Sequence, residues 1–286
     1  MPPNSQGIAS LIALGILSYF DLARCAADAT ESVHLQIEAM KLGLADAYAH
    51  VGDLDTMQTG VAELLSQHRL KELAAKISLN EARYPGQLPT PAGSGTSYLC
   101  AADCQGMVVS YIQSSGPGFG SGIVVPGTGI ALQSRASGFN FNPGHPNCYA
   151  PNKRPFHTNC PAILTNGDDA VTAFGLMGWS MQPQAHVQFA VRAVDHSQSP
   201  TSILAAPRWR IAVDEPAILL EPGFPEKTQS GLAALGHKII KTEKFFSAST
   251  PFGSHLMFGG ANMLCKAPTG WNAACDPRRD GLPAGC

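Results

Sequence analysis

The sequence has few charged residues and no excess of either sign. Charged side chains make up 14% of the 286 residues, and 19 lysines and arginines stand against 21 aspartates and glutamates, for a net charge of −2. Binding to nucleic acid needs a basic surface, so this balance disfavours a polyanionic partner. Disordered chains are poor in apolar residues and rich in charge, so a hydrophobic fraction of 44% together with the low charge predicts that the chain folds.

Cysteine is also scarce, and long hydrophobic runs are missing. The 8 cysteines show no repeated spacing, so the sequence specifies neither C-x-x-C zinc pairs nor a disulfide framework. The longest apolar stretch covers residues 8–20, which is shorter than the roughly 20 residues of a membrane-spanning helix, and no lysine or arginine precedes it. It predicts a buried helix, with no membrane span and no secretory signal, and leaves the compartment open.

The length suits one large domain or two ordinary ones, and the first third of the chain has a helical pattern. Apolar residues from Val33 to Val51 recur at spacings of 4 and 3, which places them on one helix face, and Gly52 follows where a helix commonly ends. The same spacing from Leu70 to Ile77 follows Ser66, a candidate N-cap. Together with residues 5–20, the pattern predicts three helices.

The composition changes at residues 84–94, where clustered prolines and glycines indicate an exposed linker. Beyond it, we expect short strands over residues 97–102, 107–112, 122–125, 130–133 and 171–176. Helices are then expected over 183–195, with Pro183 at the first position, and over 200–206 and 225–235. Strands over 238–241 and 255–258 complete the expected sheet. Because strands and helices occur in blocks, the pattern indicates an α+β fold.

Three features that invite a binding site have simpler explanations. The glycine-rich stretch 116–129 is not followed by the helix that a phosphate-binding loop requires, so a turn-rich hairpin fits it better. Cys100 and Cys104 would share one face of a strand without a histidine nearby, which favours packing over metal binding. The histidines at 145, 157, 186 and 196 are scattered, and most are expected to be structural or exposed.

The short segment around Thr96 is the most informative one. Thr96 opens an expected strand directly after the linker, which by itself is an ordinary arrangement. If the bond between Gly95 and Thr96 were broken, Thr96 would gain an α-amine with a pKa of about 7.7 to 8.0, so that on the order of a tenth is unprotonated at pH 7. One residue would then carry both a nucleophile and a base.

Several further motifs accompany this segment in a fixed order. They are PPNSQG at residues 2–7, GTSYLCAAD at 95–103, GFGSGI at 118–123, PGHPN at 143–147, PNKRP at 151–155, the stretch from 249 onward, and DPR at 276–278. In this order and spacing, the sequence resembles the gamma-glutamyltransferase family over nearly the whole chain. Several motifs in the right order are more specific than any one of them.

The resemblance implies an N-terminal nucleophile hydrolase with a four-layer αββα sandwich, made as one precursor that cuts itself between Gly95 and Thr96. Residues 1–95 would be the C-terminal helical part of the large subunit with its linker, and residues 96–286 the small catalytic subunit. Thr96 would attack a γ-glutamyl amide, and water or an amino acid would accept the acyl group. Gly178 and Trp179, at the family's glycine pair, would form the oxyanion hole. No metal or organic cofactor is implied.

Other positions depart from the family pattern. The family's substrate asparagine, its glutamine, its aspartate for the substrate amine and its serine pair fall on Ser115, Arg135, Gly138, and His157 with Thr158. We expect these residues other than Gly138 to line the acyl pocket, without a clamp for an α-amino acid. The family's cephalosporin-acylase-like branch has similar motifs, so a simpler diacid such as glutaryl is an alternative acyl group. Arg135 either contacts its carboxylate or forms a surface salt bridge.

The resemblance also implies that the chain matches a C-terminal portion of a longer precursor. In the family, a substrate-binding arginine and much of the sandwich lie upstream of the segment that matches Met1. The fold is therefore expected to be incomplete at its N-terminal side, and residues 1–286 alone are expected to be poorly stable, with apolar faces exposed. A non-catalytic truncated remnant is the rival hypothesis, and cleavage between Gly95 and Thr96 would distinguish the two.

Overall fold

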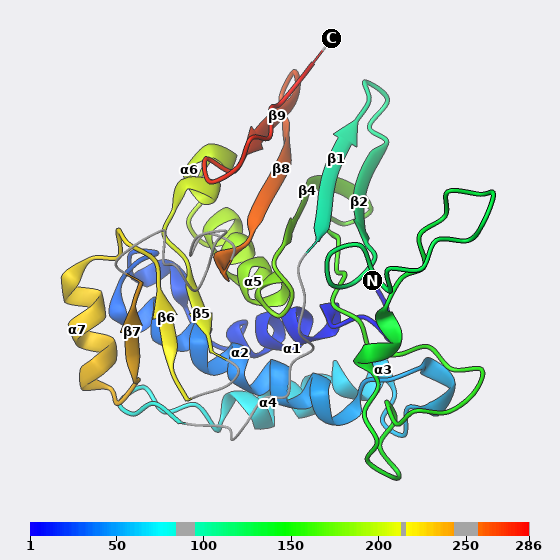
Figure 1. Cartoon of the computed structure of the whole chain (residues 1–286). Coiled ribbons are helices and arrows are strands. Elements are labelled where there is room, and N and C mark those ends of the chain that lie inside the picture. The colour runs from blue at the N-terminus through cyan, green and yellow to red at the C-terminus, as the bar shows by residue number, and fades with distance from the viewer. Residues whose placement is uncertain (84–94, 213–215, 243–256, 286) are drawn as a thin grey trace.

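The structure is a computed structural model that describes residues 1–83, 95–212, 216–242 and 257–285 (Figure 1). It is a mixed fold, as expected. The helices are α1 (Gly7–Leu17), α2 (Thr30–His50), α3 (Val61–Leu64), α4 (Gln67–Ala74), α5 (Met181–Val194), α6 (Pro200–Ala205) and α7 (Glu226–Ala234). The strands are β1 (Thr96–Ala102), β2 (Val108–Ser114), β3 (Ala162–Asn166), β4 (Asp169–Met177), β5 (Trp209–Ile211), β6 (Ile218–Leu220), β7 (Ile239–Lys241), β8 (Gly260–Ala267) and β9 (Gly270–Cys275).

The helices expected in the first third are confirmed as α1, α2 and α4. The Ser66 side chain accepts a hydrogen bond from the Arg69 N–H at 3.3 Å, which is the capping contact expected at the start of α4. The helices α1 and α2 cross closely because Gly43 has no side chain: a Cβ there would lie 2.5 Å from the Ala9 carbonyl oxygen. Among the helices that the structure describes, none is both long and apolar enough to cross a bilayer.

The sheets form two stacked layers. The larger sheet has the strand order β3-β4-β8-β9, with all neighbours antiparallel. The antiparallel pair β1-β2 lies against β4 and β8, whereas α5 and α6 cover strands of the same larger sheet from the other side (Figure 1). A helix layer and two sheet layers of the expected αββα sandwich are therefore present in the described residues. A third sheet, β5-β6-β7, packs beside α7, and its β6-β7 pair is parallel.

Tyr98, the third residue of β1, fixes this strand on the larger sheet. The Tyr98 ring lies over Gly175 of β4, where a Cβ would come within 2.4 Å of the ring. The Tyr98 carbonyl accepts a hydrogen bond from the Asn262 amide at 2.9 Å, and its hydroxyl lies 2.8 Å from the Ser110 hydroxyl. Because side chains alternate along a strand, Thr96 shares the inner face of β1 with Tyr98, while Ser97 is exposed.

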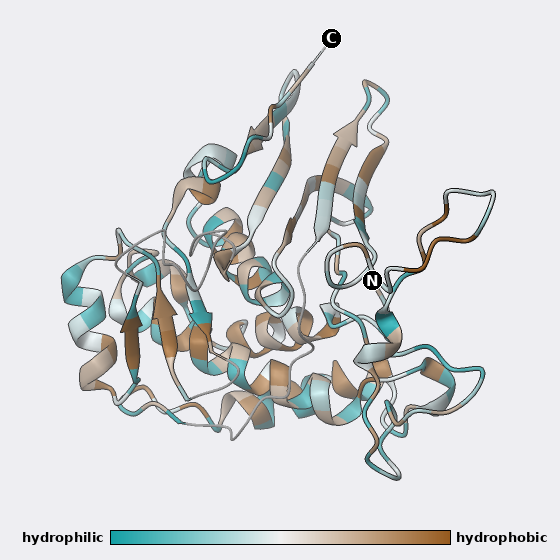
Figure 2. Cartoon of the chain, viewed as in Figure 1, coloured by the Kyte–Doolittle hydropathy of each residue, from teal (hydrophilic) through white to brown (hydrophobic). Residues whose placement is uncertain are grey.

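The larger of two hydrophobic clusters connects the N-terminal helices to the rest of the chain. Ile12 of α1 and Ile37 of α2 belong to the same buried cluster as Val187 of α5, Trp209 of β5 and Ile218 of β6. The hydropathy colouring in Figure 2 shows strands β6 and β7 as mostly hydrophobic. A second cluster fills the space between the larger sheet and α5 and α6. The core therefore includes residues from both sides of the bond between 95 and 96.

Several sequence-based expectations need correction. Helix α5 begins at Met181, so Pro183 is its third residue and not its first; proline is tolerated there because N–H groups of the first turn have no acceptor in the helix. The strand expected over 255–258 is wrong where the structure describes it: Met257 and Phe258 form a short turn, and β8 begins at Gly260. Cys104 lies beyond the end of β1 and does not share its face.

The stretches 122–125 and 130–133 pair as a hairpin loop, with Val125 and Ile130 joined by a 2.9 Å hydrogen bond, but only one isolated bridge forms and no full strands. This confirms a hairpin for the glycine-rich stretch. Strands β3, β5, β6, β8 and β9 were not expected from the sequence. The linker expected over 84–94 lies outside the described residues.

Candidate active site

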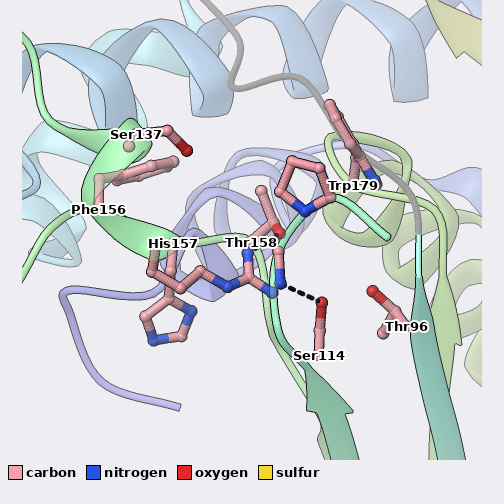
Figure 3. Close-up of a pocket in the computed structure, with 11 residues that line it drawn as sticks. Thr96, Ser114, Ser137, Phe156, His157, Thr158 and Trp179 are labelled. Carbon is pink, nitrogen blue, oxygen red and sulfur yellow. Dashed lines mark hydrogen bonds between the residues drawn. The ribbon is translucent and has the colours of Figure 1, made fainter. Parts of the chain in front are cut away.

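Thr96, the expected nucleophile, lines a small pocket at the ends of β1 and β2. Thr96 and Ser114 are register partners on β1 and β2, and Figure 3 shows their hydroxyl groups facing one another across the pocket. Arg135, Phe156 and Trp179 contribute to the other walls. The free volume is about 20 Å³, which holds about one water molecule.

The residue before the nucleophile is held in a conformation that only glycine adopts readily. Gly95 has φ +114°, and a Cβ there would lie 2.8 Å from the carbonyl oxygen of Gly118. The glycine-rich loop thus packs directly on the peptide that precedes Thr96. A side chain at position 95 would clash with this loop and displace the bond between residues 95 and 96.

Arg135 provides a positive charge at the pocket. Its Nη1 donates a 3.0 Å hydrogen bond to the Thr158 hydroxyl, and its Nη2 donates a 3.1 Å bond to the Asn159 side-chain oxygen. Burial lowers the pKa of its guanidinium. Within the described part of the chain, no carboxylate pairs with Arg135, and no aspartate or glutamate is among the residues that line the pocket. The arrangement suits an anionic group of a ligand.

His157 and Thr158 form the wall beside Arg135. The backbone of His157 bridges to residues 4 and 6: its N–H donates to the Asn4 carbonyl at 3.1 Å and its carbonyl accepts from the Gln6 N–H at 3.0 Å. Burial, aided by the nearby Arg135 charge, lowers the pKa of His157 to about 4. Its Nδ1 accepts a hydrogen bond from the Asn159 N–H, so the neutral ring carries its proton on Nε2. At neutral pH the wall adds no charge.

Trp179 lies in a backbone conformation that glycine favours. Its φ is +60°, next to Gly178 at φ +144°, and the Gln6 amide donates a 2.6 Å hydrogen bond to the Trp179 carbonyl. The same amide donates to the Thr158 carbonyl at 2.7 Å, so Gln6 joins the two pocket walls. The Trp179 N–H lies in the same peptide plane as the Gly178 carbonyl, which accepts a hydrogen bond from the Met181 N–H at 2.9 Å. The turn therefore sets the direction of the Trp179 N–H, and no hydrogen-bond acceptor for it is found among the described residues.

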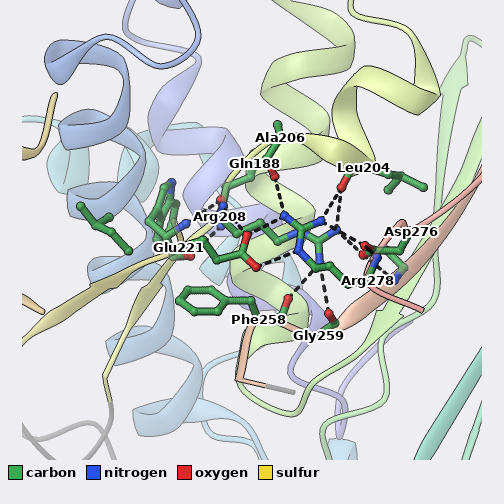
Figure 4. A network of polar contacts seen from close by, with 12 residues as sticks. Gln188, Leu204, Ala206, Arg208, Glu221, Phe258, Gly259, Asp276 and Arg278 are labelled. Carbon is green, nitrogen blue, oxygen red and sulfur yellow. Dashed lines mark hydrogen bonds and ion pairs between the residues drawn. The ribbon is translucent and has the colours of Figure 1, made fainter. Parts of the chain in front are cut away.

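A buried network of charges supports this turn from the other side. Arg208 pairs with Asp276 at 2.5 Å and donates to the carbonyls of Phe258 and Gly259 at 3.0 and 3.3 Å (Figure 4). A Cβ on Gly178 would lie 3.1 Å from the Cα of Gly259, so the two turns are in contact. The position of the Gly178–Trp179 turn therefore depends on a cluster of ion pairs in the protein interior.

The structure brings most of the expected site residues together at the pocket, but two of them are not among the residues that line it. Thr96, Arg135, His157, Thr158 and Trp179 all line the pocket. Ser115 and Gly178 do not: Ser115 accepts a hydrogen bond from the Ser134 N–H through its carbonyl at 2.8 Å, and its neighbours Ser114 and Gly116 line the pocket instead. Sequence reasoning did not identify Ser114 or Gln6 as site residues. The resemblance pointed to the PPNSQG motif, but nothing in the sequence placed Gln6 beside Trp179.

One group of metal-ligand side chains occurs in the described residues, away from the pocket. His34, Glu38 and His237 are buried together, but their atoms already bond to one another and to neighbouring groups. The His34 Nδ1 lies 2.8 Å from His237 Nε2, and the Lys41 ammonium donates to Glu38 at 2.6 Å. Because the ammonium already occupies the carboxylate, the arrangement favours an internal polar network over a metal ion.

Comparisons with known proteins agree with this geometry. A family model described as Gamma-glutamyltranspeptidase matches residues 1–286. A glutathione hydrolase-like proenzyme, YwrD, of Bacillus subtilis is 33% identical over 99% of this chain and 53% of its own length. An oxamate amidohydrolase proenzyme of Klebsiella pneumoniae is 32% identical over 100% of this chain and 52% of its own length. A solved cephalosporin acylase from Bacillus halodurans superposes with a TM-score of 0.85 and 37% identity, covering 99% of this chain and 49% of that one. The chain thus spans about half the length of the curated relatives it matches.

Proposed function

The chain belongs to the gamma-glutamyltranspeptidase family, and from this premise we propose that it contains the catalytic part of an N-terminal nucleophile hydrolase that cuts itself before Thr96. The observation that carries the proposal is the position of Thr96 at the start of β1, facing a pocket that also contains the Trp179 turn and Arg135, which has no carboxylate partner among the described residues. Of the 286 residues, 95 precede the proposed cut and 191 follow it. The two pieces are the helical part with the linker and the catalytic part.

Self-cleavage and catalysis use the same hydroxyl group. In the first step, the Thr96 hydroxyl attacks the Gly95 carbonyl carbon, the peptide nitrogen leaves as the Thr96 α-amine, and water hydrolyses the resulting ester. The glycine conformation at 95 supports this step, because without a side chain residue 95 packs closely against the Gly118 backbone and the peptide to be cut is confined. The cut supplies the α-amine that acts as base in each later turnover.

In turnover, the Thr96 hydroxyl attacks the carbonyl carbon of an amide while the α-amine takes the hydroxyl proton. The N–H of Trp179, together with that of Gly178, donates to the oxyanion of the tetrahedral intermediate, a contact worth about 2.7 to 4 kcal/mol in a comparable hydrolase. The protonated α-amine then returns the proton to the leaving amine. Water, or an amino acid in a transfer reaction, attacks the acyl ester and frees Thr96.

The acyl group recognised here ends in a carboxylate. Arg135 lacks an acidic partner among the described residues, and its guanidinium fork matches a carboxylate in two parallel hydrogen bonds. A γ-glutamyl group also brings an α-ammonium, and at Gly138, where the family has its aspartate, no acid is present to pair with it. Within the family chemistry of γ-glutamyl transfer and hydrolysis, the pocket therefore favours a glutaryl-type acyl group over γ-glutamyl.

The test begins with the mass of the protein expressed in its complete reading frame. We expect a new N-terminus at Thr96 after incubation, one uncut chain for Thr96→Ala, and normal cutting for the control Ser97→Ala, whose side chain lies on the exposed face of β1. A wild-type chain that stays intact, or a Thr96→Ala chain that is still cut before residue 96, contradicts the proposal.

The acyl group is tested with matched anilides. We expect a higher kcat/KM for glutaryl p-nitroanilide than for the γ-glutamyl compound, and a smaller preference in Arg135→Ala. Arg154→Ala removes an exposed cation outside the pocket and serves as the control. Equal or faster turnover of the γ-glutamyl substrate refutes the assignment of Arg135 and leaves the role of Thr96 unaffected.

A further inference from the structure

A second cavity lies directly beside the pocket at Thr96. It has a volume of about 220 Å³, far larger than the roughly 20 Å³ of the first pocket. The two share Ser137, Gly138 and Phe156 as walls. The two cavities therefore adjoin each other at these three residues.

Aromatic side chains form the apolar walls of the second cavity. Tyr48, Phe139 and Phe156 line it, together with Val51. The rings of Tyr48 and Phe156 pack against each other with centroids 5.5 Å apart and planes tilted by 55°. Ring faces and edges of this kind favour another ring in offset or edge-to-face contact.

Most polar side chains of the second cavity are already hydrogen-bonded to the protein, whereas the buried Tyr48 hydroxyl has no hydrogen-bond partner among the described residues. The Asn147 N–H donates to His145 Nδ1 at 3.0 Å, so the ring carries its proton on Nε2, which donates to the Tyr48 carbonyl at 2.8 Å. Asn147 is likewise occupied, because its amide donates to the Gly138 carbonyl at 2.7 Å and its oxygen accepts from the Phe156 N–H at 2.8 Å. Apart from the Tyr48 hydroxyl, the walls therefore offer shape and aromatic surface more than hydrogen bonds.

Charge and size narrow the class of ligand further. Among the described residues that line the second cavity, none is a lysine, arginine, aspartate or glutamate. An ionised group placed there would lose its hydration without a partner. An apolar cavity of about 150 Å³ is known to hold benzene, so the second cavity has room for a substituted six-membered ring.

We propose that the second cavity binds an uncharged aromatic ring carried by the amide substrate. Its role in turnover rests on the proposed function at Thr96, whereas ring binding itself does not. The carboxylate of the substrate then contacts Arg135 at the first pocket, and the ring lies between Tyr48, Phe139 and Phe156. The substrate class is an aryl-substituted acyl amide with a single negative charge.

Binding is tested without catalysis, in the uncut Thr96→Ala protein. 4-Fluorobenzamide, followed by fluorine NMR, is a neutral probe of the right size. We expect saturable binding that Phe139→Ala weakens about tenfold. The control is Phe141→Ala: this neighbouring ring also contacts Tyr149, is 81% exposed and does not line the second cavity. Absence of saturable binding, or equal weakening by both variants, overturns the proposal.

A kinetic comparison tests the link to turnover in the mature enzyme. An anilide whose diacid chain carries a phenyl group should have a lower KM than the unsubstituted glutaryl anilide, and Phe139→Ala should remove most of the difference. If the protein does not cut itself, the proposed function fails while the probe titration still decides whether the cavity binds a ring. If both anilides turn over with the same KM, the second cavity is not part of the substrate site.

Discussion

Asp276→Asn tests the buried charge network that supports the Gly178–Trp179 turn. The substitution keeps the shape of the side chain and removes its charge. The Asp276 side chain is 0% exposed and the Arg208 side chain 2%, so both charged groups are buried away from water. Each of the two carboxylate oxygens of Asp276 also accepts a backbone hydrogen bond, from the N–H groups of Ala261 and Arg278 at 3.1 and 3.0 Å.

The expected loss of stability follows from the charge balance. Arg208 and Arg278 are offset by Asp276 and Glu221, so the network is neutral, and the substitution leaves one uncompensated positive charge in the interior. Removing one partner of a buried ion pair costs about 3 to 5 kcal/mol. At about 2 °C per kcal/mol for a domain of this size, the melting temperature should fall by about 6 to 10 °C.

The pH dependence gives an independent check. Burial alone raises the pKa of Asp276, but the attraction of Arg208 and Arg278 outweighs it and holds this pKa below its usual value. A carboxyl with a lowered pKa stabilises the fold above the pKa of the unfolded chain, about 3.9, and this stabilisation is lost as the pH falls through the folded value. The difference between wild type and Asp276→Asn should therefore be full near neutral pH and shrink below about pH 4.

The assay is thermal unfolding followed by circular dichroism, with Asp21→Asn as the control. Asp21 pairs with Arg24 at the surface, where the two side chains are 54% and 83% exposed, and its loss should leave the melting temperature unchanged within error. If Asp276→Asn and Asp21→Asn behave alike at pH 7, the network does not stabilise the fold, and its support of the Trp179 turn is refuted.

Three further predictions concern the site and its surroundings. Gly95→Ala should slow self-cleavage strongly, because a Cβ would lie 2.8 Å from the Gly118 oxygen; the mass of the chain over time measures this, and an unchanged cutting rate contradicts it. Gln6→Leu should lower kcat about tenfold or more and leave KM nearly unchanged, because it frees the carbonyls of Thr158 and Trp179; the exposed Gln58→Leu is the control, and a loss confined to KM would show that Gln6 does not position the oxyanion turn. Burial lowers the pKa of His157 to about 4 and of His186 and His237 to about 3, so these rings stay neutral in the folded protein while the unfolded chain binds protons below about pH 6.5. Stability should therefore be full above that pH and fall as the pH drops toward 4, with uptake of about three protons on unfolding; urea midpoints that stay constant over this range would refute the shifts.

The sequence predicted elements with strong periodicity better than it predicted contacts. The helices α2 and α4 were expected because their apolar spacing and the Ser66 cap are local signals. The short strands β5 and β6 have only 3 residues each, too few to show alternation, and they are held by pairing with each other and by burial in the core. The strand expected at 255–258 failed because the turn at Gly259, with φ +76°, separates that stretch from β8.

The same distinction applies to the candidate site. The order of motifs was enough to predict that Thr96, Arg135 and Trp179 belong together. The register between β1 and β2 was not visible in the sequence: Thr96 pairs with Ser114, and because side chains alternate on a strand, it is Ser114 and not Ser115 that faces the pocket. Gln6 lies 173 residues from Trp179 along the chain, and no local pattern predicts a contact over that distance.

The core that joins α1 and α2 to α5 and β6 also determines the order in which folding and cutting can occur. While residues 95 and 96 are linked, the two sides of this core find each other within one molecule. Once the bond is cut as proposed, the same contacts hold two separate polypeptides, and any molecule that unfolds must reassemble by a second-order encounter that depends on concentration. Refolding in dilute solution then becomes slow where it was unimolecular before. Cleavage would thus make the folded state one that is reached through the intact chain and, once lost, is not readily regained.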